Sequence, residues 1–209
     1  MSTFKYQQYN VNYVVDGDLI DNDGIIVILN GIMMSAKSWE MFIDSFSKHN
    51  CVVRFDMFDQ GETSKLTEDY TQEVQVELLK ALLIHLKVKK VNLVGISYGA
   101  SVALQFVSKY QEFVKKMVVA NVVSKTSDWL KAIGDGWNQV AASRNGEAYY
   151  NISIPYIYSP QFYTKNIKWM TDRKKVLVPL FSDKVFLDAM VRLTKSAETH
   201  NVIGDLADV

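Results

Sequence analysis

VNLVGISYGA, residues 91–100, is the segment from which the architecture of this 209-residue chain is most readily inferred. It opens with a short apolar run, Val91–Val94, of buried-strand length. A G-x-S-x-G pentapeptide, Gly95–Gly99, follows, and the residues from Ala100 to Tyr110 are typical of a helix. A serine at such a strand–turn–helix junction is held in strained backbone geometry, with its hydroxyl projecting at the end of the strand. Ser97 is therefore a candidate nucleophile; the alternative is a small-residue turn in which Ser97 only caps the helix.

A second loop supplies the hydrogen-bond donors that such a nucleophile requires. Attack on an acyl carbon creates an oxyanion, and loss of one donor to it typically costs about 3–4 kcal/mol of barrier. Asn30-Gly31-Ile32 directly follows the apolar run Ile25–Leu29. The backbone N–H groups of Tyr98 and Ile32 are the natural pair of donors, and the N-terminus of the helix after Ser97 favours an anion at the same point. The alternative is an ordinary strand-to-helix loop.

Strand-like runs alternate with helix-like segments over the first 123 residues. Apolar, β-branched runs predict strands, and apolar residues at the 3.6-residue period predict helices. The first two strands are expected to join tightly near Asn10, and Asp21–Gly24 to form a turn. The alternation predicts an α/β fold, a mostly parallel sheet with helices on both faces. The predicted strands are residues 4–9, 11–15, 25–29, 51–55, 91–94 and 117–120, and the predicted helices are residues 36–46, 72–86 and 100–110.

From Ser124 onward the alternation stops. Helical spacing dominates there, and aromatic side chains are dense between Tyr149 and Trp169. All three prolines also fall in this part of the chain. The sequence therefore predicts two domains, residues 1–123 with the sheet and residues 124–209 as a mostly helical unit.

Composition and charge exclude several functional classes. Apolar residues make up 48% of the chain and charged residues 22%, which excludes intrinsic disorder. Basic and acidic residues number 23 each, so no basic surface for nucleic acid or an anionic membrane is expected. A single cysteine, Cys51, closes no disulfide within the chain and builds no zinc cluster. No signal peptide and no apolar run of about 18 residues is found, so a cytoplasmic protein without a membrane segment is expected.

Three motifs, in this order, resemble those of the α/β-hydrolase superfamily. They are Asn30-Gly31-Ile32, the polar turn from Asp56 to Gly61, and the pentapeptide around Ser97. The resemblance covers residues 1–123 well and implies the first six of the family's eight strands, with a helical cap inserted after the sixth and the last two strands missing. It implies Ser97 as nucleophile and no metal or organic cofactor. Two positions depart from the family pattern: Asn30 replaces a histidine, and Asp59 replaces a glycine in a turn that is expected to be scaffold.

The family's catalytic triad is incomplete in this sequence. Its acid and histidine lie on loops after the seventh and eighth strands, so both are expected beyond residue 209. His49 and His85 are expected to be structural. His200 with Asp183 or Asp188 is an alternative that has the right chain order.

Asp128 is another candidate acid, because some relatives place theirs after the sixth strand. Met33, Met34, Trp129 and Tyr158 are candidate lining residues of an apolar acyl pocket, although the aromatic stretch fits core packing equally well.

The sequence therefore predicts a serine hydrolase that acts on an ester, a thioester or a related acyl compound. The alternative is an inactive small-molecule-binding or scaffold protein of the same fold. A small-molecule acyl substrate is the expected partner. Because the sixth strand would end the sheet with an open edge, a homodimer or a complementing C-terminal segment is also expected.

Overall fold

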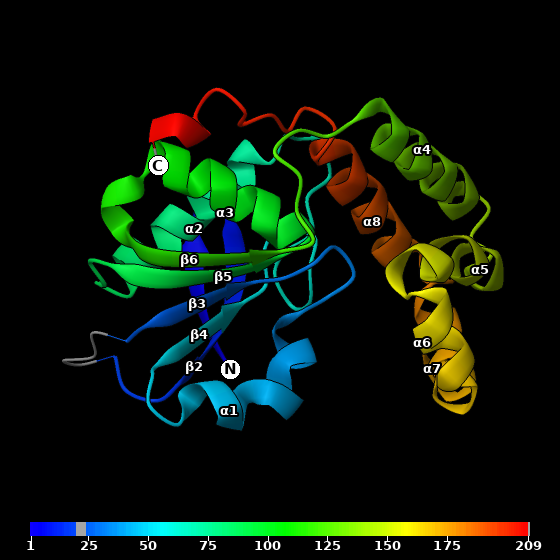
Figure 1. Cartoon of the computed structure of the whole chain (residues 1–209), viewed down its shortest axis with the longest axis horizontal. Coiled ribbons are helices and arrows are strands. Elements are labelled where there is room, and N and C mark those ends of the chain that lie inside the picture. Colours follow the sequence, from blue (N-terminus) through cyan, green and yellow to red (C-terminus); the bar gives the residue numbers. More distant parts are fainter. Residues whose placement is uncertain (20–23, 209) are drawn as a thin grey trace. The chain divides into compact units, whose positions relative to one another are not determined.

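The computed structural model describes residues 1–19 and 24–208, and a six-stranded sheet organises its larger part (Figure 1). The order across the sheet is β1-β2-β4-β3-β5-β6. β1 and β2 run antiparallel, whereas β3, β4, β5 and β6 run parallel to one another. The predicted α/β class with a mostly parallel sheet is confirmed. The strands are β1 (Ser2–Tyr6), β2 (Tyr9–Asp16), β3 (Ile26–Leu29), β4 (Val52–Phe55), β5 (Val91–Ile96) and β6 (Val114–Ala120).

The first hairpin turns earlier than predicted. Tyr6 pairs with Tyr9, and Gln7 takes a positive φ of 54°, so the connection is at residues 7–8 and not near Asn10. This register places Phe4 opposite Val11, and both side chains are buried. Burial of this apolar pair outweighs the turn preference of asparagine. Residues 21–23 of the second predicted turn lie outside the described part of the chain.

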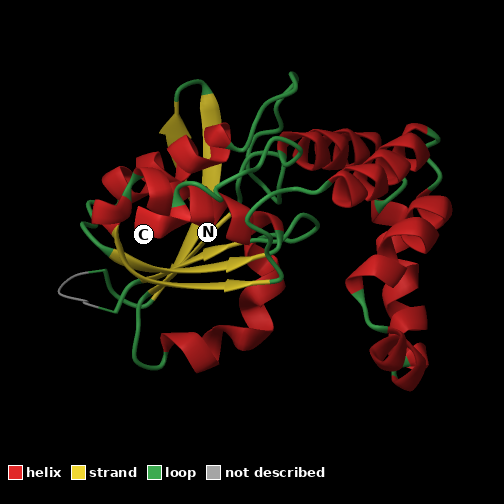
Figure 2. Ribbon diagram, turned by 45° about the horizontal axis from the view of Figure 1, so that its top comes forward, coloured by secondary structure: helices red, strands yellow, loops and turns green. Residues whose placement is uncertain are grey.

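Helices cover both faces of the sheet (Figures 1 and 2). α2 (Glu73–His85) and α3 (Tyr98–Lys109) lie on one face, while η1 (Ala36–Phe42) and α1 (Ile43–Ser47) lie on the other. Trp39 and Ile43 pack there against Ile28 and Val52 of the sheet. Because both faces are covered, all four residues of β4 are buried, as expected of a parallel strand. Two short helical turns, η2 (Gln111–Phe113) and η3 (Leu206–Asp208), complete this part.

The chain divides into two compact units. Unit 1 contains residues 1–126 together with the segment that begins at Ser196, and unit 2 contains residues 127–195. The sequence-based division had assigned everything after residue 123 to the helical unit. The C-terminal segment belongs to unit 1 because its backbone pairs there: Thr126 N donates to His200 O at 3.0 Å, and Val202 N donates to Ser124 O at 2.8 Å. Such pairing between distant residues leaves no periodic pattern in the sequence.

Unit 2 consists of helices in its described residues, as predicted. Ser159 accepts a hydrogen bond from Phe162 N, and Pro160 occupies the first turn of the helix that follows, where proline is well tolerated. Tyr149 and Phe181 pack edge to face with ring centroids 5.2 Å apart, and both are buried. Part of the aromatic stretch is therefore core. The helices are α4 (Asp128–Ala142), α5 (Gly146–Ile157), α6 (Pro160–Lys165), α7 (Ile167–Leu180) and α8 (Lys184–Ser196).

Across residues 1–19 and 24–208, no helix combines the length and the apolar composition that crossing a bilayer demands.

Candidate active site

Ser97 occupies the junction between β5 and α3, as the sequence predicts. Its backbone has φ 52° and ψ −117°, a conformation that residues other than glycine rarely adopt. Ser97 N donates to Ala120 O of β6 at 2.9 Å, and Ser97 O accepts from Ala100 N at 2.9 Å. The strained turn is thus anchored on both sides. The Ser97 residue itself is exposed at the C-terminal end of the parallel strands.

Two glycines permit the close approach of α3 to the strand ends. A Cβ atom at Gly95 would lie 2.7 Å from Ala100 Cα. A Cβ atom at Gly99 would overlap the backbone of Leu29 and Asn30 at the end of β3. The start of α3 therefore sits directly against the end of β3. Glycine is required at both positions because backbone atoms, unlike a flexible side chain, cannot move aside.

The loop after β3, residues Asn30–Ser35 and hereafter the β3 loop, adjoins this junction. A Cβ atom at Gly31 would lie 3.6 Å from Ile96 O. Met34 N donates to Gly31 O at 3.1 Å, which closes a four-residue turn. Ile32 is a central residue of that turn, so the closing bond does not use its N–H. The N–H of Tyr98 is also outside the intrahelical ladder, because Tyr98 is the first residue of α3.

Asn30 anchors the β3 loop through its side chain. The residue is fully buried. Its Nδ2 donates to Phe55 O at 2.8 Å, and its Oδ1 accepts from Trp39 Nε1 at 2.8 Å. The carboxamide thus links β3 to β4 and η1. These bonds also give its buried polar atoms the hydrogen-bond partners that they require. Asn30 is a structural residue that shapes the loop.

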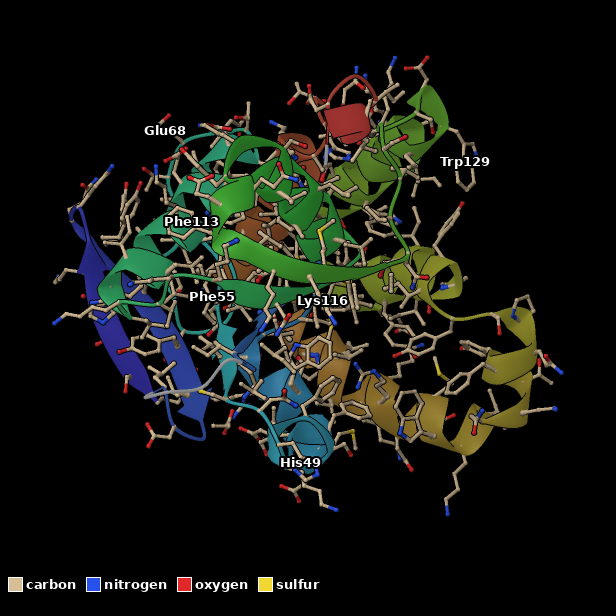
Figure 3. All side chains as sticks on the ribbon, turned by 60° about the vertical axis from the view of Figure 1, so that its left-hand side comes forward. His49, Phe55, Glu68, Phe113, Lys116 and Trp129 are labelled. Carbon is tan, nitrogen blue, oxygen red and sulfur yellow. The ribbon has the colours of Figure 1, made fainter. Side chains whose placement is uncertain are left out.

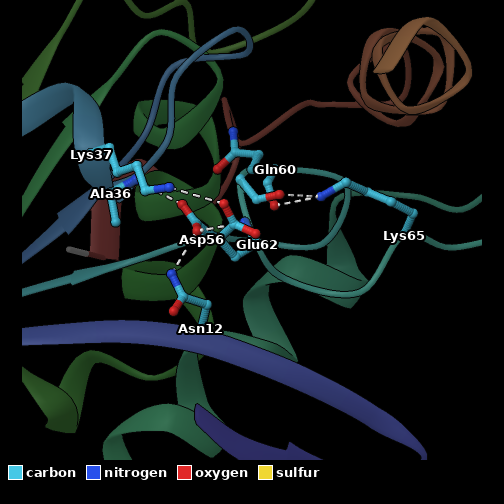
Figure 4. Close-up of polar contacts among 8 residues, drawn as sticks. Asn12, Ala36, Lys37, Asp56, Gln60, Glu62 and Lys65 are labelled. Atoms are coloured by element: carbon cyan, nitrogen blue, oxygen red, sulfur yellow. Dashed lines mark hydrogen bonds and ion pairs between the residues drawn. The ribbon is translucent and has the colours of Figure 1, made fainter. Parts of the chain in front are cut away.

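The polar turn after β4 is organised around Asp56 (Figure 4). Its Oδ1 accepts from Ala36 N at 2.7 Å, and its Oδ2 accepts from Asn12 Nδ2 at 2.8 Å and from Glu62 N at 2.9 Å. Asp59 has a φ of 67°. Aspartate tolerates this left-handed conformation better than most residues, which explains how it replaces glycine here. The scaffold role expected for this turn agrees with these contacts.

Tyr98 is held by its side chain as well as by its place in α3. The phenol is buried, and its oxygen lies 2.8 Å from Ser196 Oγ. Burial raises the pKa of Tyr98 well above its ordinary value, so the group stays neutral. Sequence reasoning assigned Tyr98 only a backbone role and missed this contact, because it joins residues 98 positions apart.

All three histidines lie within the described residues, and none has the environment of a catalytic base. His49 is exposed, next to α1 and before the start of β4 (Figure 3). Because β4 and β5 run in the same direction, the N-terminal end of β4 and the C-terminal end of β5 lie at opposite ends of the strands. His49 is therefore at the end of the sheet opposite to Ser97. His85 Nε2 lies 3.2 Å from Tyr13 Oη, and its ring stacks on Phe4. Both were expected to be structural.

His200 is also structural, so the alternative triad through it is wrong. Its Nε2 donates to Val123 O at 2.8 Å, and its Nδ1 accepts from Gln105 Nε2 at 3.0 Å. Both ring nitrogens are thereby bonded to neutral amide groups, and neither is left to accept a proton from a nucleophile. Burial lowers the pKa of His200 below its ordinary value, which keeps the ring neutral.

The candidate acids have other partners within unit 2. Asp183 Oδ1 accepts from Phe186 N at 2.7 Å near the start of α8. Asp188 bonds to Arg144 at 2.5 Å and to Lys184 at 2.7 Å, and these cations lower the pKa of the Asp188 carboxyl. The Asp128 carboxylate is fully exposed, 3.8 Å from Lys131 Nζ. In the described residues no group of three or more His, Cys, Asp or Glu side chains is arranged to hold a metal.

The four predicted lining residues belong to different surroundings. Met33 and Met34 are half-buried in the β3 loop of unit 1, and Met34 packs against the Trp39 cluster. Trp129 projects from α4 of unit 2 with 67% of its surface exposed (Figure 3). Tyr158 follows α5 and contacts the rings of Phe162 and Trp169. Their role in a pocket stays a prediction.

A cavity of about 460 Å³ lies elsewhere on unit 1. Neither Ser97 nor the β3 loop contributes to it. Its lining residues are Glu73, Gln105, Val107, Ser108, Lys109, Gln111, Asn201, Val202 and Asp205.

Among solved structures, the chain is most informatively compared with MGS-M2, an alpha/beta hydrolase enzyme from a Medee basin deep-sea metagenome library. The two are 62% identical with a TM-score of 0.98, and the match covers 100% of this chain and 76% of MGS-M2. The enol-lactonase from Burkholderia xenovorans LB400 matches with a TM-score of 0.79 at 16% identity over 98% of this chain and 76% of that chain, which shows a shared fold.

Curated relatives match over shorter regions. The (E)-2-((N-methylformamido)methylene)succinate hydrolase of Acinetobacter baylyi is 31% identical over 100 residues, 48% of this chain and 38% of that protein. The putative 2-succinyl-6-hydroxy-2,4-cyclohexadiene-1-carboxylate synthase of Bacillus subtilis is 28% identical over 136 residues, 64% of this chain and 48% of that protein. The chain thus spans less than half the length of either relative. The sequence model of the family described as "alpha/beta hydrolase fold" matches residues 24–189. With its sheet order, its glycine-flanked serine turn and this match, the chain belongs to the alpha/beta hydrolase family.

Proposed function

We propose that this chain provides the nucleophile and the oxyanion-binding groups of a serine hydrolase. Ser97 is the nucleophile, and the N–H groups of Tyr98 and Ile32 are the donors to the oxyanion. The observation that carries the proposal is the backbone of Ser97, whose φ of 52° and ψ of −117° hold an exposed serine at the N-terminus of α3. Strain of this kind persists where the surrounding structure enforces it, and it is concentrated at functional sites.

The reaction follows from this placement. Ser97 Oγ attacks the acyl carbon while its proton passes to a base, and the carbonyl oxygen becomes an anion. Two fixed N–H groups and the positive end of α3 stabilise that anion more than they stabilise the neutral carbonyl, which lowers the barrier. The base then gives this proton to the leaving group. Water attacks the acyl-enzyme while the base takes a proton from it, and the base returns that proton to Ser97 Oγ as the acid product leaves.

The base and its acid are proposed to come from a segment that is not among these residues. His49 faces the wrong edge of the sheet, His85 contacts Tyr13 and Phe4, and His200 has both ring nitrogens occupied. We therefore propose that the histidine belongs to a segment outside these residues.

The proposed substrates are esters, thioesters or related acyl compounds. This proposal is in keeping with two proteins of the same fold, the enol-lactonase from Burkholderia xenovorans and a thermophilic esterase from Thermogutta terrifontis. Met33 and Met34 are proposed to line the acyl pocket, because methionine side chains are apolar and adapt to varied shapes. A cytoplasmic location belongs to the same proposal.

The edge strand β6 is the proposed attachment site for the complementing segment or, without it, for a second copy of the chain. β6 is hydrogen-bonded to β5 on one side only in the sheet order. Val118 of this strand is 64% exposed. Unpaired backbone groups beside exposed apolar side chains are a template for another strand.

A chimera tests the proposed activity. The chain is joined to the part of MGS-M2 that the match leaves uncovered, and hydrolysis of p-nitrophenyl acetate and butyrate is followed. We expect turnover by the chimera, loss of at least about 10³-fold in Ser97→Ala, and no loss in the control Ser45→Ala, an exposed serine of α1. Equal turnover by Ser97→Ala and the parent chimera would refute the proposal. Absence of turnover and of covalent labelling in the parent would favour a binding protein of the same fold.

A further inference from the structure

Gln60 connects the polar turn after β4 to the β3 loop. The side chain is 2% exposed. Its Nε2 donates to Gly31 O at 3.0 Å, and its Oε1 accepts from Asn30 Nδ2 at 3.3 Å. The Gln60 backbone is fixed as well, because its N donates to Met57 O at 3.0 Å and its O accepts from Lys65 Nζ at 2.8 Å (Figure 4). The residue is therefore a rigid bridge between the two loops.

The bond to Gly31 O controls the direction of a neighbouring N–H. Gly31 C=O and Ile32 N–H belong to the same planar trans peptide unit, in which the two groups point in opposite directions. Gly31 O accepts two hydrogen bonds, one from Gln60 Nε2 and one from Met34 N at 3.1 Å. Because the peptide unit is planar, the two bonds that hold Gly31 O also fix the direction of the Ile32 N–H.

The bridge is itself held from behind. Asn30 Oδ1 accepts from Trp39 Nε1, and Asn30 Nδ2 donates both to Phe55 O and to Gln60 Oε1. With its oxygen occupied by Asn30, the Gln60 carboxamide can present only its nitrogen to Gly31 O. The orientation of the Gln60 amide is thus set by this hydrogen-bond network and not by contact with solvent.

We propose that Gln60 is a positioning residue that aims the Ile32 N–H at the developing oxyanion. The inference rests on the proposed function, since it assigns that N–H a role in catalysis. It adds a second role to the scaffold role expected for the turn from Asp56 to Gly61: the Gln60 side chain would influence the reaction through the peptide group between Gly31 and Ile32.

The test compares Gln60→Met and Gln60→Glu with the control Thr63→Val, all in the MGS-M2 chimera. Methionine keeps the length of the side chain without a donor, and glutamate keeps its shape with an oxygen in place of the nitrogen. Thr63 is an equally buried residue whose Oγ1 donates to Asp56 O at 2.7 Å. The same Oγ1 accepts from Asn12 N at 2.8 Å. Substitution of Thr63 by valine therefore removes two buried hydrogen bonds next to this turn without touching Gly31, so it reports the purely structural cost.

Two measurements decide the outcome. In Gln60→Met we expect kcat to fall about 10- to 100-fold with KM changed less than about threefold, short of the 10²–10³ that complete loss of one donor costs. Spectra of ¹⁵N-isoleucine-labelled chain should show a displaced Ile32 amide signal in the Gln60 variants and an unchanged one in Thr63→Val. If Gln60→Met fails to fold, Gln60→Glu carries both measurements.

The inference is overturned if the Ile32 signal stays in place, or if kcat falls no more in the Gln60 variants than in Thr63→Val. If the parent chimera is inactive, the proposed function fails on its own account. The Ile32 signal still decides in that case whether Gln60 directs this N–H, because it requires no turnover.

Discussion

At the scale of single residues, backbone conformation separates Ser97 from the other serines of the chain. Ser97 bears a Cβ atom at a φ of 52°, which costs of order 1–3 kcal/mol. Asp59 and Gln7 have similar φ values, but they lie in turns. Ser97 instead joins a strand directly to a helix. The strain is the part of the site that the sequence predicted best, because two glycines and one serine at fixed spacing specify it.

Substitution of Ser97 by glycine and by alanine measures this strain. Glycine removes the Cβ atom and alanine keeps it, so Ser97→Gly should be more stable than Ser97→Ala by about 1–2 kcal/mol. At exposed Ser45 within α1 the order should reverse, with glycine about 0.5–1 kcal/mol less stable than alanine. Urea denaturation of the four variants provides the values. The same order at both positions would mean that Ser97 is unstrained.

At the scale of elements, loops are tied together by buried polar side chains. Asp56 joins the end of β4 to β2, to the start of η1 and to residue 62. Asn30 and Gln60 do the same for the β3 loop. The sequence revealed the strands and helices through their periodicity, but not these links. A side chain that bonds to a residue 20 or more positions away produces no repeating pattern, so Gln60 was not predicted.

Loss of the Asp56 carboxylate should disconnect these elements. Asp56→Asn replaces one acceptor oxygen by an N–H₂ group that faces backbone N–H donors, and we expect a loss of about 2–4 kcal/mol in the free energy of unfolding. Glu62→Gln is the matched control, because Glu62 and its partner Lys37 are both exposed. That variant should unfold at the same urea concentration as the wild-type chain. Equal effects of the two substitutions would refute the structural role of Asp56.

The C-terminal segment should make stability depend on pH. Burial lowers the folded-state pKa of His200 from its ordinary value of 6.5, so the unfolded chain binds a proton more readily than the folded chain. The free energy of unfolding should therefore be greatest above pH 6.5 and should fall as the pH drops through this value. His200→Gln should flatten the dependence between about pH 8 and pH 5, while His49→Gln should keep it. Parallel curves for wild type and His200→Gln would contradict this assignment.

At the scale of the whole molecule, the sheet and the helical unit were predicted, but the return of the chain to unit 1 was not. Residues 200–202 pair with residues 124–126, and no composition shift marks that return. The open side of β6, in contrast, was expected from the sequence, and β6 is the last strand in the sheet order. Lys116 and Val118 of this strand are exposed, as Figure 3 shows for Lys116.

The 209-residue chain should self-associate through β6. Val118→Lys places a second charge on the exposed face of the edge strand and should shift sedimentation velocity profiles toward monomer. Val176→Lys, which alters an equally exposed valine of α7 in unit 2, should leave the profile unchanged. The MGS-M2 extension should also favour the monomer by occupying the same edge. A monomeric wild-type chain at high concentration would contradict the expectation.

Reaction of the chimera with a fluorophosphonate, followed by mass spectrometry of its peptides, examines the chemistry at position 97 most directly. The reagent phosphonylates a serine whose oxygen is activated beside donors for the phosphoryl oxygen. We predict a single adduct on the peptide that contains Ser97, absent in Ser97→Ala and formed more slowly in Gln60→Met. An adduct on another serine, or none on Ser97 in a chimera that hydrolyses esters, would show that the acyl group is attacked from elsewhere.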